Sequence, residues 1–255
     1  MKIYVAMHKP YSAPEDPLYV PIQAGAANRA AFCDVRDDTG RNISGRNASF
    51  CELTVLYWLR HNTCEDVAGL VHYRRYFAGK QRTGSVRRSL LTEAELQALM
   101  QDVQIVLPRK RHYVIETTLS QYAHAHHEKD LHLMRGIVEK NCPQELPAFD
   151  RVMKSRSGHR FNMLIMKREA LEAYCDWLFP LLFELEKQID ISSYDAYNRR
   201  VFGFIGERLL DVWLQNCGYA FAELPVLELE RPNWFIKGGR FLWRKITHTL
   251  RTKSD

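Results

Sequence analysis

The sequence lacks the patterns that mark several common classes of protein. No apolar run approaches the roughly 18 to 20 residues that a membrane-spanning helix needs, and the amino-terminal stretch MKIYVAMHKP has neither the basic start nor the longer apolar run of a signal peptide. The six cysteines include no Cys-x-x-Cys pair, so their spacing suggests neither a zinc cage nor a disulfide framework. These absences predict a cytoplasmic protein with reduced thiols.

Several catalytic motifs are also missing. The sequence contains no Gly-x-Ser-x-Gly nucleophile elbow, no Gly-rich phosphate loop and no dinucleotide fingerprint. It also lacks Asp-x-Asp, the motif with which many enzymes that use nucleotide sugars hold a divalent metal. Glu-x-Glu pairs do occur, but we expect them on helices or after a terminal strand, where residues two apart do not converge. These pairs are Glu93/Glu95, Glu184/Glu186 and Glu228/Glu230.

The net charge of +6 lies entirely in residues 231–255, so residues 1–230 are formally neutral. We therefore predict one domain over 1–230 and a separate basic, aromatic tail over 231–255. A neutral body argues against nucleic acid as a partner. The tail has apolar residues at helical spacing among its basic ones, a pattern typical of a helix that lies on an anionic membrane, and docking of the tail on the domain fits the pattern equally well. Docking of the tail on the domain and a nucleic-acid-binding module acting through the tail are the alternatives.

Apolar runs that end at polar residues predict strands, and helical patterns separate them. The strands are expected over 2–8, 67–72, 102–107 and 161–167. Alternation of strands and helices in one chain favours an α/β layer fold with a ligand site at the carboxyl ends of strands.

Helix boundaries are predicted from capping and stop signals. Capping boxes are expected at Ser49/Glu52 and at Thr92/Glu95. A helix over 168–189 contains Pro180, which predicts a kink or a break. A further helix over 206–216 is expected to end before Gly218.

The segment 69–77 is the strongest candidate for a ligand site, because an apolar strand runs directly into His72, Tyr73, Arg74 and Arg75. Paired guanidinium groups match the oxygens of a diphosphate. We infer that Arg74, Arg75 and His72 take the place of a metal ion, so no cofactor is expected. The alternative is a solvated or ion-paired strand end.

A histidine-rich segment over 122–132 is the competing candidate for a metal site. His124, His127 and Glu128 are expected to share a helix face, but the segment lacks the His-Glu-x-x-His order of a zinc protease. A polar patch lining the cleft is the preferred interpretation.

Transfer of a group to a hydroxyl needs a base, usually a carboxylate, that accepts the proton of the attacking hydroxyl. Asp195 lies in a turn-like, aromatic-flanked stretch and Glu207 begins a helix, so both are candidates. Asp190 and Glu52 are less attractive, because Glu52 is expected to cap a helix. For each of these carboxylates a structural role is the competing interpretation.

Five segments of the sequence together resemble one protein family. The segments are 38–47, 50–58, 69–77 with the His-Tyr-Arg-Arg-Tyr-Phe motif, 161–167 and 190–210. The family they resemble is that of capsular and exopolysaccharide biosynthesis proteins, long filed as a domain of unknown function and later associated with galactofuranosyltransferases. The likeness runs from about residue 2 to about residue 225 and leaves out the tail.

The resemblance implies a GT-A-like, Rossmann-related α/β fold with a mixed central sheet. It implies a metal-independent galactofuranosyltransferase that uses UDP-galactofuranose with inversion to form a β-linkage. The acceptor is expected to be a lipid-linked or oligosaccharide precursor of O-antigen, capsule or exopolysaccharide, and another UDP-sugar remains the alternative donor. The residues expected near the donor are His8, Gln23, Gly25, Asn42, Asn47, Glu52, His72, Tyr73, Arg74, Arg75 and Asn162, and those expected in catalysis are His159, Asp195 and Glu207.

Overall fold

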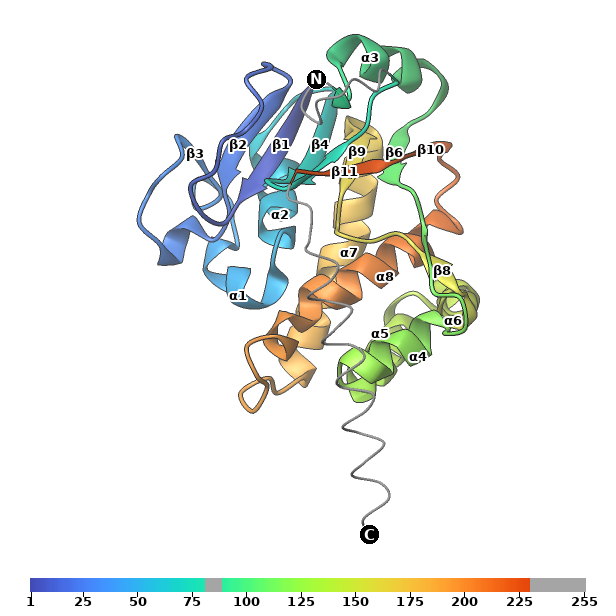
Figure 1. The fold of residues 1–255 in the computed structure, drawn as a ribbon. Coiled ribbons are helices and arrows are strands. Elements are labelled where there is room, and N and C mark those ends of the chain that lie inside the picture. The colour runs from blue at the N-terminus through green and yellow to red at the C-terminus, as the bar shows by residue number, and fades with distance from the viewer. Residues whose placement is uncertain (81–88, 230–255) are drawn as a thin grey trace, which may run out of the picture.

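A mixed sheet of nine strands forms the centre of the computed structural model, which describes residues 1–80 and 89–229 (Figure 1). The strand order is β10-β6-β9-β4-β1-β2-β3, and β5 joins β4 to β11. The predicted tail over 231–255 lies outside the described residues. The strands of this sheet are β1 (Lys2–Met7), β2 (Tyr19–Gln23), β3 (Val35–Arg36), β4 (Val67–His72), β5 (Arg75–Phe77), β6 (Ile105–Pro108), β9 (Leu164–Lys167), β10 (Phe221–Leu224) and β11 (Val226–Glu228).

The parallel strands β1, β2 and β4 bring their carboxyl ends to one edge of the sheet. Met7 pairs with Gln23 and Ala6 pairs with His72, so the residues that follow these positions meet there. The turn after β4 is short, because His72 pairs directly with Arg75 of β5. Residues 73 and 74 therefore form the tip of a tight hairpin beside the end of β1.

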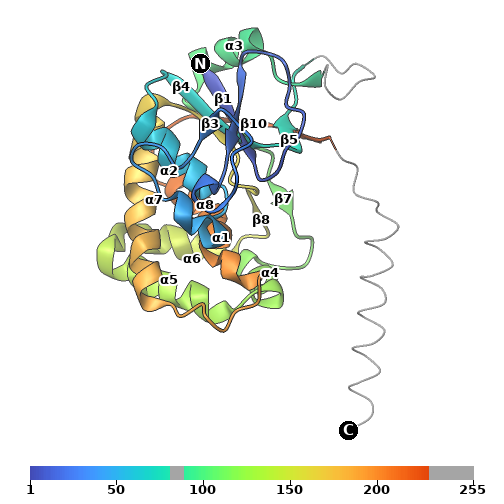
Figure 2. The same ribbon diagram turned by 90° about the vertical axis from the view of Figure 1, so that its left-hand side faces the viewer.

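The two faces of the sheet are buried by different elements. Alternation along β1 directs Tyr4 and Ala6 into the larger core, and Ile3 and Val5 into a smaller core on the opposite face. Figures 1 and 2 show α2, α7 and α8 gathered together, with α4, α5 and α6 beyond them. The helices are α1 (Asn47–Phe50), α2 (Leu53–Asn62), α3 (Glu93–Asp102), α4 (Thr118–Ala125), α5 (Glu128–Asn141), α6 (Leu146–Lys154), α7 (Arg168–Gln188) and α8 (Val201–Leu214).

Two of the predicted strands begin later than expected. Phe161 and Asn162 have φ angles of 79° and 51°, which an extended strand cannot contain, so β9 begins at Leu164. α3 continues to Asp102, so β6 begins only at Ile105. The strand predicted over 67–72 is confirmed with its bounds.

The helix predictions need three corrections. The capping box at Thr92 and Glu95 is confirmed, but the one at Ser49 is wrong, since Cys51 has a φ of 55° and separates α1 from α2. Of the kink or break predicted at Pro180, the break is wrong, because α7 continues through Pro180. Burial of the neighbouring Phe179 and Leu181 in the core offsets the loss of one backbone hydrogen bond. α8 begins at Val201, five residues before the predicted start.

No helix among residues 1–80 and 89–229 is both long enough and apolar enough to cross a bilayer. Two short strands, β7 (Arg111–His112) and β8 (Ser157–Gly158), form a separate antiparallel pair near α4 and α6 (Figure 2).

Candidate active site

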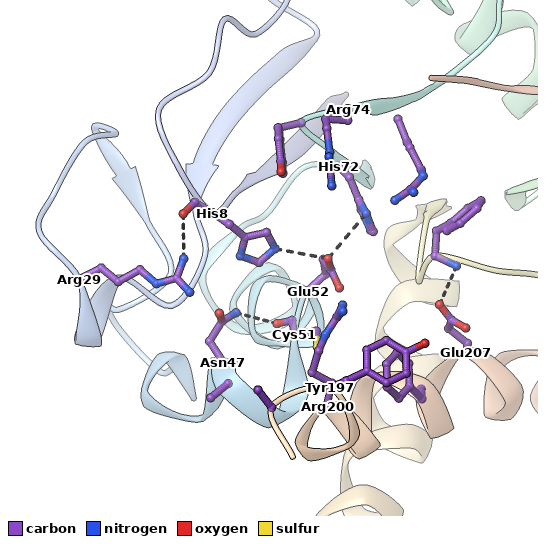
Figure 3. A pocket seen from close by; sticks show the side chains of 16 residues that line it. His8, Arg29, Asn47, Cys51, Glu52, His72, Arg74, Tyr197, Arg200 and Glu207 are labelled. Atoms are coloured by element: carbon purple, nitrogen blue, oxygen red, sulfur yellow. Dashed lines mark hydrogen bonds and ion pairs between the residues drawn. The ribbon is translucent and has the colours of Figure 1, made fainter. Parts of the chain in front are cut away.

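A cavity of about 570 Å³ opens where the carboxyl ends of β1 and β4 face α1, the 3₁₀ turn Asn198–Arg200 and the start of α8 (Figure 3). Four arginines and two glutamates line it, so its lining carries an excess of positive charge. The predicted residues that line the cavity are His8, Asn47, Glu52, His72, Tyr73, Arg74, Arg75 and Glu207.

Glu52 lines the cavity and lies between the side chains of His8 and His72 (Figure 3). Its Oε1 is 3.3 Å from Nε2 of His8 and 3.7 Å from Nδ1 of His72. Burial opposes ionisation, but His72 and His8 outweigh it and hold the pKa of Glu52 below its ordinary value. The backbone places Glu52 before α2 with no capping hydrogen bond from its side chain, so the capping role expected for it is wrong.

His72 is the buried partner in this cluster. Its burial lowers the pKa of the imidazole, Glu52 opposes this, and the charge of Arg75 lowers the pKa further. The net shift is downward, so His72 is neutral at pH 7 while Glu52 is anionic. The cluster therefore presents the carboxylate of Glu52 and the neutral imidazole of His72 to the cavity.

Arginines line much of the rest of the cavity. Arg75 is held by a hydrogen bond of 3.1 Å from its Nε to Glu228 and lies 4.4 Å over the ring of Phe161. Arg74 lies 4.9 Å over the ring of Tyr73. Arg29 donates to the backbone oxygen of His8 at 2.8 Å. Guanidinium groups fixed in this way form a preorganised binding surface for an anion such as a diphosphate.

Arg200 enters the cavity from the segment that precedes α8. Its Nε donates to Sγ of Cys51 at 3.1 Å. Burial raises the pKa of Cys51 to about 12, so this thiol stays protonated and does not serve as a nucleophile at neutral pH.

The wall formed by α8 and the segment before it carries aromatic rings and a carboxylate. Tyr197 is 52% exposed, and its ring centroid lies 5.2 Å from that of Phe204. Glu207 accepts the backbone N–H of Phe161 at 2.9 Å and a hydrogen bond of 3.0 Å from Arg208. This wall therefore contributes the fixed carboxylate of Glu207 and the aromatic rings of Tyr197 and Phe204 to the cavity that the arginines also line.

A buried aspartate is linked through Thr54 to Asn47, which lines the cavity. Asp37 is fully buried and accepts hydrogen bonds from the backbone N–H groups of Gly25 and Ala26 and from the hydroxyls of Ser44 and Thr54. Gly25 has a φ of 67°, which suits glycine. This network fixes the segment after β2 against the start of α2.

Four residues predicted near the donor lie outside the cavity lining, and three of them are Gln23, Gly25 and Asn42. Gln23 is buried, and its side chain binds the backbone of Ala30 and Phe32. Asn42 forms a local turn through Gly40 and Ser44. Gly25 supports the site indirectly, since a Cβ there would lie 2.7 Å from the side chain of Asn47.

Asn162 and two of the predicted catalytic residues also lie outside the lining. His159 is buried between Asp211 and Glu223, with its Nε2 3.1 Å from Glu223. Asp195 is exposed and accepts the backbone N–H of Asn198 at 2.7 Å. Asn162 is buried and donates to the backbone oxygen of Gly203. Of the three predicted catalytic residues, Glu207 is the one that lines the cavity.

The histidine-rich segment is divided between two helices. α4 ends at Ala125 and α5 begins at Glu128, so His124 and His127 do not share a helix face and that prediction is wrong. His126, in the break, instead lies 4.1 Å from Phe204 between ring centroids. Among the described residues, no three His, Cys, Asp or Glu side chains are grouped to hold a metal ion.

Sequence reasoning missed several residues of the lining: Arg29, Cys51, Phe161, Tyr197, Arg200 and Phe204. Arg200, Tyr197 and Phe204 fall inside the segment 190–210, which carried part of the family resemblance, so that segment was the available signal. For Arg29 the sequence contains no comparable signal.

A family model described as a domain of unknown function, DUF4422, matches residues 2–218. The chain belongs to the DUF4422 family. No curated protein matches the sequence. A solved structure, titled as the apo form of the bifunctional glycosyltransferase WbbM, is 29% identical with a TM-score of 0.84.

The likeness to WbbM covers 90% of this chain and 45% of that one, so this DUF4422 chain spans less than half of the length of WbbM. Together with the mixed central sheet, it confirms the predicted GT-A-like α/β fold. The predicted resemblance to a domain of unknown function is also confirmed. Its association with galactofuranose stays a prediction.

Proposed function

We propose that this chain is a glycosyltransferase that moves a sugar from a nucleotide diphosphate donor to a glycan acceptor. The observation that carries the proposal is the cavity, which places four arginines at the carboxyl edge of a parallel strand set, opposite Glu207. Departure of a nucleoside diphosphate develops negative charge, and fixed guanidinium groups stabilise such charge. The likeness to a structure titled as a glycosyltransferase supports the same reaction class.

Arg74 and Arg75 are the groups that we assign to the diphosphate, in place of a metal ion. Both lie on the β4–β5 hairpin, next to the end of β1, and both line the cavity. Arg29 and Arg200 approach the same space from other elements. Within the proposed reaction, Glu207 takes the proton from the attacking hydroxyl of the acceptor, and Glu52 orients His8 and His72.

The donor is proposed to be UDP-galactofuranose, used with inversion to give a β-linkage in O-antigen, capsule or exopolysaccharide. This finer assignment rests on the family resemblance. A lipid-linked or oligosaccharide acceptor is proposed with this donor. A peripheral location at the inner face of the cytoplasmic membrane is proposed from the basic, aromatic sequence of residues 231–255.

Calorimetric binding of UDP and of a panel of UDP-sugars, with donor hydrolysis measured alongside, tests the proposal. Arg74→Ala is expected to weaken UDP binding by at least about tenfold, since a charge-assisted pair to phosphate is lost. Arg151→Ala is the matched control, because Arg151 is exposed on α6. The chelator EDTA is expected to leave binding and hydrolysis unchanged.

Three results would count against the proposal in different ways. Failure of every nucleotide to bind removes the transferase assignment. Loss of activity with chelator and recovery with a divalent cation removes the metal-independent mechanism. Preference for another UDP-sugar removes galactofuranose but keeps the reaction class.

A further inference from the structure

The loop between β7 and α4 exposes two adjacent aliphatic side chains. Val114 is 82% exposed and Ile115 is 83% exposed. The next most exposed large apolar residues in the described part of the chain are Tyr197 at 52% and Phe221 at 40%. Two adjacent aliphatic side chains with this much exposed surface are unusual, and the proposed reaction gives them no role.

The tip of this loop is held in shape by its backbone. Its two stems are tied to one neighbouring segment, by hydrogen bonds of 2.8 Å from Tyr113 N to Arg156 O and 2.7 Å from Thr118 N to Ser155 O. The oxygen of Tyr113 accepts the N–H of Ile115 at 2.7 Å. Val114 has a φ of 61°, a region that β-branched residues rarely adopt. The apolar pair is therefore presented outward on a preorganised turn.

Basic residues lie on the two segments that flank the tip. Arg109 and Arg111 are exposed on the approach to the loop, with Lys110 between them, and Lys154 and Arg156 are exposed on the segment that ties its stems. The acidic side chain in the loop, Glu116, binds Nδ1 of His124 at 2.6 Å. The surroundings of the apolar pair therefore carry a clear excess of positive charge.

The loop is also connected to the cavity. The guanidinium of Arg160 lies 4.9 Å over the ring of Tyr113 and its Nη1 is 3.4 Å from Oε2 of Glu207, which lines the cavity. In Figure 2 the segment from β7 to α4 runs along the outer edge of the molecule, beside β8. Two side-chain contacts, Tyr113 with Arg160 and Arg160 with Glu207, therefore link the loop to the cavity.

We infer that this loop docks on an anionic lipid bilayer, with Val114 and Ile115 entering the interface and the basic side chains meeting lipid headgroups. Aliphatic tips flanked by Lys and Arg bind anionic membranes through apolar burial and electrostatic attraction together. A stable protein complex buries about 800 Å² per partner, far more than two side chains offer. Bilayer docking by this loop places the cavity beside the membrane surface.

Vesicle flotation of the full chain tests this assignment, with phosphatidylcholine vesicles that contain or lack phosphatidylglycerol. Val114→Asn combined with Ile115→Ser is expected to reduce the partition constant on anionic vesicles about tenfold. Both positions are exposed, and Asn tolerates a positive φ, so folding is retained and is checked by thermal melting. Phe221→Ser is the matched control and is expected to bind as wild type.

A second variant tests the charges. Arg111→Gln with Arg156→Gln is expected to weaken binding about fivefold per arginine, and only on vesicles with phosphatidylglycerol. Lys187→Gln, an exposed position on α7, is its control. These losses of vesicle affinity stay measurable even when another part of the chain also binds the vesicle. All contacts of one molecule with one vesicle contribute to a single overall affinity, so the loss of any of them lowers it.

Wild-type vesicle binding by the Val114→Asn, Ile115→Ser variant overturns the inference. A change in oligomeric state by light scattering, with vesicle binding unaltered, overturns it in favour of a protein partner. No nucleotide sugar is present in either assay, so these outcomes are independent of the proposed reaction.

Discussion

Replacing the buried carboxylate Asp37 with its amide is expected to lower the free energy of unfolding by about 3 to 6 kcal/mol. Asp37 is fully buried and accepts four hydrogen bonds: from Gly25 N at 2.9 Å, Ala26 N at 3.0 Å, Thr54 Oγ1 at 2.7 Å and Ser44 Oγ. In Asp37→Asn the amide keeps one acceptor oxygen and turns an NH₂ group toward two donors. Two charge-assisted hydrogen bonds are lost, each worth about 1.5 to 3 kcal/mol.

Urea unfolding followed by tryptophan fluorescence measures this loss as a shift in the midpoint at constant slope. Asp38→Asn is the matched control. Asp38 binds Arg36, whose side chain is 39% exposed, so that variant is expected to unfold close to the wild type. An Asp37→Asn protein as stable as wild type, or an equal loss in both variants, would refute the assignment of Asp37 as the anchor of the site.

Two further predictions concern the cavity. The pKa of His72 is lowered in the folded state by burial, so the unfolded chain binds more protons just below pH 6.5 and stability falls as pH falls through that window. Melting temperatures at pH 7.5 and 5.5 are therefore expected to differ less in His72→Gln than in wild type, and an unchanged difference contradicts this. Glu207→Gln is expected to slow sugar transfer by about 10² to 10⁴ and to change UDP affinity little. Wild-type turnover by that variant, in single-turnover kinetics, excludes Glu207 as the base.

Local sequence signals predicted the elements whose causes are themselves local. The alternation along β1, the apolar run of β4 and the capping box at Thr92 depend on neighbouring residues, and each is present in the structure. The apolar run of β4 changes abruptly to polar and cationic residues, and this local change predicted Arg74 and Arg75 at a ligand site. Both line the cavity.

Glu52 illustrates where a local signal is overruled. The spacing of Ser49 and Glu52 matches a capping box, but the positive φ of Cys51 turns the chain between α1 and α2. Glu52 then lies against His8 and His72, which are 44 and 20 positions away in sequence. No pattern within one helix encodes that contact.

The sequence by itself determined the fold class and the strand that delivers the cationic groups, because hydrophobic periodicity and turn chemistry act over a few residues. Only the tertiary structure decided that Arg29 and Arg200 join the cavity and that His159 is buried elsewhere. It also decided that Asp37 anchors the site. Such contacts join segments far apart in the chain, and parallel strand register and helix packing bring those segments together.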